Sequence, residues 1–116
     1  MSDLYSRILL KLRNIDGVKM TALGSRDGFL FSENENDEIE KMTLMSSAMI
    51  KAAETVTNEL DKTGPVHVIV DFNGGKLIAA SAGPKALISV MAEQNASIDP
   101  IIGEIDRTAS KIQEIL

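Results

Sequence analysis

The 116-residue chain contains no cysteine, no tryptophan and a single histidine, and its aromatic residues are one tyrosine and three phenylalanines. Without cysteine, disulfide frameworks, thiolate zinc sites, Fe–S clusters and thiol nucleophiles are excluded. The lone histidine, His67, rules out multi-histidine metal sites, and its place between two valines favours a strand surface residue over a catalytic base. So few aromatic side chains leave little material for stacking a nucleobase, a flavin or a haem. We therefore expect a protein that is not an enzyme and holds neither a cofactor nor a metal ion.

Basic residues are also scarce compared with acidic ones. Twelve Lys and Arg stand against seventeen Asp and Glu, a net charge of −5, whereas affinity for nucleic acid depends on clustered positive charge. Nucleic acid is therefore not an expected partner. Gly74-Gly75-Lys76 is similar to the end of a phosphate-binding loop, but Val70 and Leu77 stand where that loop requires a glycine and a Ser or Thr. A hairpin turn is the better interpretation.

The first twelve residues do not make a membrane segment. Asp3, Arg7 and Lys11 interrupt their apolar residues, unlike the apolar core of a secretory signal or a bilayer-spanning helix. A cytoplasmic protein without membrane insertion is expected. The length, with 44% hydrophobic and 25% charged residues, predicts one domain over residues 1–116.

Hydrophobic spacing predicts a helix, two strands and a turn at the start of the chain. Apolar residues recur at helical spacing over residues 4–15, and Val18–Leu23 alternates as a strand does. Ser25–Gly28 has the composition of a turn. Phe29–Phe31 is therefore expected to return as a second strand.

A long helix should follow the acidic loop Glu33–Glu38, because carboxylates are favoured near a helix N-terminus. Asp37 with Glu40 resembles a capping box, and residues 62–65 should end the helix. The stripe expected to cover the core consists of Ile39, Met42, Met45, Met49, Ala53, Val56 and Leu60.

The second half should add strands over 66–72 and 76–82, joined by a hairpin turn. Residues 86–91 are compatible with a fifth strand or a short helix, and the short apolar run favours the strand. A closing helix should be capped by Asp99, with Pro100 in its first position. The resulting order is α-β-β-α-β-β-β-α, with antiparallel hairpins. Strands that are apolar on both faces need helices on both sides, so we expect an α/β (α+β) three-layer sandwich with a five-stranded sheet.

Two surfaces have more apolar residues than one core requires. Leu44, Ala48 and Ala52 lie together on a second side of the long helix, where a solvent-facing helix normally carries charge. The strand 66–70 is an aggregation template if it stays at an open sheet edge. A twofold copy satisfies both surfaces. The expected homodimer interface comprises Leu44, Ala48, Ala52, Val66, Val68 and Val70.

The element order, together with Ile15-Asp16-Gly17-Val18 and the turn Arg26-Asp27-Gly28, resembles the roadblock family of dynein light-chain and gliding-motility regulator proteins. Ile101-Ile102-Gly103 at the opening of the last helix fits as well. The resemblance implies a profilin-like antiparallel sheet with the long helix on one face and the terminal helices on the other. It also implies a homodimer that binds or regulates a Ras-like small GTPase.

The leading hypothesis is therefore a non-enzymatic homodimeric adaptor for a small GTPase. The candidate contacts on the long helix are Lys41, Lys51, Thr55 and Glu59. No arginine lies in a motif that indicates an arginine finger. Two alternatives stay open: a small-ligand sensory domain of PAS or GAF type, and a structural subunit of a larger assembly.

Overall fold

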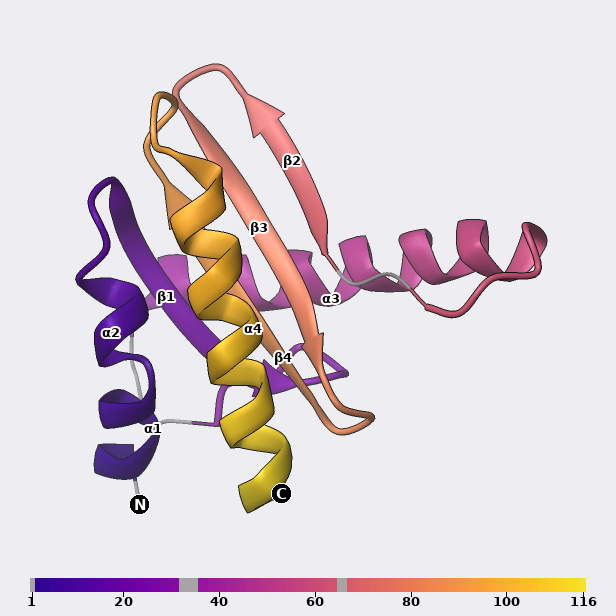
Figure 1. Ribbon diagram of the computed structural model, residues 1–116, viewed down its shortest axis with the longest axis horizontal. Helices are drawn as coiled ribbons and strands as arrows, with labels where there is room; N and C mark the ends of the chain where they lie inside the picture. Colours follow the sequence, from indigo (N-terminus) through magenta and orange to yellow (C-terminus); the bar gives the residue numbers. More distant parts are fainter. Residues whose placement is uncertain (1, 32–35, 65–66) are drawn as a thin grey trace.

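A computed structural model describes residues 2–31, 36–64 and 67–116 (Figure 1). Its elements are α1 (Ser2–Ile8), α2 (Leu10–Arg13), β1 (Val18–Ser25), α3 (Asp37–Glu59), β2 (Val68–Phe72), β3 (Gly75–Ala82), β4 (Ala86–Ala92) and α4 (Ile98–Ile115). The described strands form one antiparallel sheet in the order β1-β4-β3-β2, so β1 and β2 are its edges. The strand expected at residues 86–91 is confirmed as β4.

Over the described residues, the sheet has four strands instead of the expected five. In the segment Phe29–Phe31, Leu30 forms a single isolated bridge with Gly24. Leu30 and Phe31 still point to opposite faces of the sheet, since they pack against the clusters on the two sides. The alternation was therefore predicted correctly, but three residues are too few for the run of pairs that makes a ladder.

Helices cover both faces of the sheet, as predicted. In Figure 1, α2 and α4 lie in front of the strands and α3 crosses behind them. On the α4 side, Ile101, Ile105 and Ile112 are fully buried against the sheet. On the α3 side, Met42 packs with Ala22 and Leu77, while Ile50 packs with Ala79 and Leu87. Burying an aliphatic side chain of this size stabilises the fold by roughly 1.5–3 kcal/mol, so these two layers hold the sandwich together.

The helix boundaries differ from the sequence prediction at several ends. Asn36, not Asp37, caps α3: its Oδ1 accepts a hydrogen bond of 2.9 Å from the backbone N–H of Glu38. The helix ends at Glu59, and Asp61 has a φ of +56°. Asp37, Glu38 and Glu40 occupy its first turn, where the helix dipole favours carboxylates.

The terminal helices show similar shifts. The single helix expected over residues 4–15 is divided into α1 and α2 at Leu9, which is buried. The last helix begins at Ile98, with Ser97 as its N-cap in place of Asp99, so Pro100 is its third residue. Proline is tolerated there because the first-turn N–H groups of a helix have no intrahelical partner.

Candidate interaction surface

The C-terminal half of α3 extends beyond the sheet. In Figure 1 this end of the helix projects past the edge strand β2, with no strand in front of it. Met45, Val56 and Leu60 were expected to cover the core, but they are 48%, 57% and 62% exposed. Helical periodicity identified the apolar side of α3 correctly. The core expectation fails for Val56 and Leu60 because the helix is longer than the sheet is wide. It fails for Met45 because this side chain lies on the side of the helix that faces away from the sheet.

The second apolar side predicted for α3 is also exposed. Leu44 is 50% exposed, and Ala48 and Ala52 are both solvent-exposed. The outward and lateral faces of α3 therefore carry apolar side chains over most of the helix, with only two cations, Lys41 and Lys51, along its length.

The edge strand β2 lies beside this overhang. Among the described residues, β2 pairs with β3 alone, so its other edge is open. Ile69, Val70 and Phe72 are each more than 40% exposed, whereas Val68 is half-buried against the α3 side. Val66, which was included in the expected interface, lies outside the described residues. An open apolar edge of this kind is a template for pairing with another strand.

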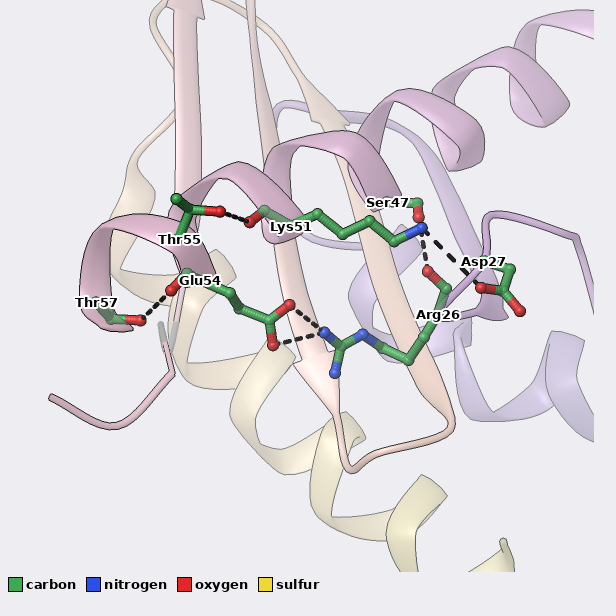
Figure 2. A network of polar contacts seen from close by, with 7 residues as sticks. All are labelled: Arg26, Asp27, Ser47, Lys51, Glu54, Thr55 and Thr57. Carbon is green, nitrogen blue, oxygen red and sulfur yellow. Dashed lines mark hydrogen bonds and ion pairs between the residues drawn. The ribbon is translucent and has the colours of Figure 1, made fainter. Parts of the chain in front are cut away.

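One flank of α3 is closed by the turn after β1. Figure 2 shows Arg26 reaching Glu54, where its Nη2 donates to Oε1 and Oε2 at 2.6 and 2.7 Å. The hydroxyl of Ser47 donates to the Arg26 carbonyl at 2.6 Å. A Cβ added to Gly28, whose φ is +97°, would lie 3.1 Å from the Cα of Leu44. The turn therefore rests directly on this flank of the helix. The opposite flank, which carries Val56, is left free, and we refer to it as the free flank of α3.

A hollow of about 360 Å³ lies next to the first turn of α3. It is lined by Lys19, Met20, Glu38, Phe72, Gly74 and Met91. Met20 and Met91 are half-buried and pack at the border of the α3-side core, so the floor of this hollow is apolar. No local sequence pattern indicated it, because its lining comes from both edge strands of the sheet, from β4 and from α3.

The structure places the four candidate partner contacts on the solvent side of α3, where Lys41, Lys51, Thr55 and Glu59 are all exposed. Lys51 Nζ lies 4.0 Å from Asp27 Oδ1, with both side chains more than half exposed (Figure 2). Exposed pairs of this kind stabilise a protein by ~1 kcal/mol or less. Lys51 is therefore available to a partner at little cost to the fold.

His67 has a structural contact that the sequence did not predict. It stands immediately before β2, and its Nε2 lies 2.8 Å from Asp106 Oδ1 on α4. This contact joins the start of β2 to α4, the helix on the face of the sheet opposite α3. It involves residues 39 positions apart, so local patterns could not predict it.

Other kinds of site find little support. The described residues contain no group of three or more His, Asp or Glu side chains that could hold a metal ion. A hollow of about 560 Å³ is lined by Ile15, Asp16, Gly17, Glu93, Asn95, Ala96, Ser97 and Pro100. None of these residues is buried, so the hollow is an open surface feature unlike the enclosed cavity that a sensory domain offers to a ligand. Within the described ranges, no helix is long and apolar enough to cross a membrane.

Comparison with known proteins agrees with this architecture. The family model of the Roadblock/LC7 domain matches residues 4–92. The chain belongs to the Roadblock/LC7 domain family. It is 27% identical over 115 residues to the uncharacterized protein MJ0714 of Methanocaldococcus jannaschii, and the match covers 97% of both chains.

Several solved structures share the fold of this chain. A Roadblock/LC7 domain from Streptomyces avermitilis has a TM-score of 0.86 at 17% identity, covering 95% of both chains. The gliding protein MglB from Thermus thermophilus has a TM-score of 0.84 at 13% identity, covering 98% of this chain and 89% of that one. LokiProfilin1 has a TM-score of 0.61 at 17% identity over the whole of both chains, which confirms the profilin-like fold.

Proposed function

We propose that this Roadblock/LC7 protein forms a homodimer through the free flank of α3 and the open edge of β2. Two β2 strands pairing across a twofold axis would close the edge that each protomer leaves open. The C-terminal turns of each α3, which project past β2, would then lie over the sheet of the partner. Val56 and Leu60 would thereby lose the solvent exposure they have in the single chain.

The hollow beside α3 supports the same arrangement. It lies on the α3 side of the sheet and has an apolar floor made by Met20 and Met91, with Phe72 of β2 at its border. A partner helix laid antiparallel to α3 along its free flank would bring Val56 and Leu60 toward this hollow. Val56 and Leu60 of each protomer would then cover the apolar floor of the hollow in the other protomer.

We propose further that the dimer binds and regulates a Ras-like small GTPase. Membership of the Roadblock/LC7 family, whose resemblance implies such a partner, supports the proposal. The platform is the outer surface of the paired α3 helices, where Lys51 lies beside the 26–28 turn and Thr55 is one turn further along the helix. Arg26 is held by Glu54, so positioning of the GTPase's own residues is the mode of action that we propose in place of an arginine finger.

The observation that carries the proposal is the exposed apolar flank of α3 in a chain of this family. Its test is a binding assay of the full chain against the small GTPases of its host, each loaded with GDP or with a non-hydrolysable GTP analogue. We expect one GTPase to bind in one nucleotide state, at a ratio of one or two GTPases per dimer. Failure of every GTPase to bind in both states would contradict the proposal, and the structural-subunit hypothesis would then take precedence.

A further inference from the structure

The outward row of α3 is symmetric about the middle of the helix. Its residues are spaced alternately four and three apart, and all of them are exposed: Lys41, Met45, Ala48, Ala52, Thr55 and Glu59. Lys41 and Glu59 lie equally far from position 50, and the same holds for Met45 with Thr55 and for Ala48 with Ala52. Alternation by three and four is the spacing with which one helix packs along another.

This symmetry has a consequence for two antiparallel copies of α3. If a twofold axis passes beside residue 50, each Lys41 stands at the level of the partner's Glu59, about 13.5 Å from the axis. Packed helix axes are roughly 8–10 Å apart, a separation that a lysine and a glutamate side chain can span together. The small side chains of Ala48 and Ala52 fall at the centre of the row.

Neither charge has an ion-pair partner within its own described chain. The ion pairs of α3 join Glu54 to Arg26 and Lys51 to Asp27, which leaves out both Lys41 and Glu59. Glu59 is the last residue of α3, and the last turn of this helix contains no basic residue. The negative end of the helix dipole disfavours a carboxylate there. An antiparallel copy would place the positive end of its dipole beside Glu59.

We propose that Lys41 and Glu59 form two reciprocal ion pairs across the twofold axis, and that this charge pattern makes the chain select a second copy of itself. The inference rests on the proposed dimer and adds its register and its selectivity. Lys41 follows three carboxylates in the first turn of α3, so its reversal would leave Glu59 facing negative charge only. Lys51, on the flank that faces the 26–28 turn, would remain for the GTPase.

The test uses charge reversal in the full chain. Lys41→Glu or Glu59→Lys alone sets like charges opposite each other twice, and we expect the dimer dissociation constant to rise about tenfold or more. The double variant recreates two attractive pairs and should return to the wild-type value. An equimolar mixture of the two single variants should form a heterodimer in preference to either homodimer, measured by native mass spectrometry with one variant labelled with ¹⁵N.

Lys51→Glu is the matched control, since Lys51 is an exposed cation of the same helix on the flank that faces the 26–28 turn. Its dimer dissociation constant should stay at the wild-type value. Circular dichroism checks that each variant folds. If one single variant does not fold, the dissociation constant of the double variant tests the ion pairs.

A wild-type dimer whose dissociation constant is unmoved by either single reversal would overturn the pairing. A double variant that is not restored, or a statistical mixture of dimers, would overturn it too. A monomeric wild type at every concentration would instead refute the proposed dimer.

Discussion

Val56 offers the sharpest test of the free flank of α3. It is 57% exposed in the single chain, so a substitution there removes almost no packing from the protomer. Burying a whole valine side chain is worth roughly 1.5–3 kcal/mol, and about half of that remains to be gained at the interface. Replacing Val56 by Asp in both copies therefore removes roughly 2 kcal/mol from the free energy of dimer formation. Burying the new carboxylates at the interface costs additional free energy.

We therefore expect Val56→Asp to raise the dimer dissociation constant at least about 30-fold. The thermal unfolding of the separated chain should change little, because valine and aspartate have similar helix propensities. Asn58→Asp is the control: it adds the same charge two residues later, at an exposed position on the side of α3 that faces the 26–28 turn. Sedimentation velocity over a range of concentrations gives the dimer dissociation constants of both variants. A Val56→Asp protein that remains as dimeric as Asn58→Asp would refute the assignment of this flank.

Three further predictions concern the turn and the platform. Lys51→Glu should weaken GTPase binding at least about fivefold by titration calorimetry while the dimer mass is unchanged, since its contact with Asp27 is exposed; unchanged GTPase affinity would remove Lys51 from the platform. Glu54→Gln should lower the free energy of unfolding by about 0.5–1 kcal/mol in urea, because Arg26 loses a charge-assisted contact that is partly screened by solvent; a loss above about 3 kcal/mol would mean that the pair is far less screened than its exposure indicates. Gly28→Ala should cost more than about 1 kcal/mol, since φ is +97° and the added Cβ would approach Leu44; a neutral effect in the same assay would show that the turn can lift from the helix.

The order of elements and the three layers followed from local patterns. Alternation and helical spacing located β1, β3, β4 and α4 to within a few residues, because each contributes a complete apolar face to a core. The strand 29–31 failed to form a ladder because too few residues pair. Periodicity could identify the apolar stripe that includes Met42 and Val56, but it could not tell where the sheet beneath α3 ends.

The contacts of the interaction surface were less accessible to sequence reasoning. Arg26 and Glu54 are 28 positions apart, and His67 and Asp106 are 39 apart. Neither pair belongs to one helix face or one hairpin, so no local spacing brings its members together. The exposed side of Ala48 and Ala52, in contrast, could be predicted, because an apolar face opposite the core face stands out against ordinary helix composition.

The solution mass of the unmodified chain tests the central claim most directly. Sedimentation equilibrium over micromolar to submillimolar concentrations should give twice the mass of the 12.5 kDa chain, approached from below as the concentration rises. A mass that stays at one chain over the whole range would show that the free flank of α3 and the open edge of β2 do not bind a second copy.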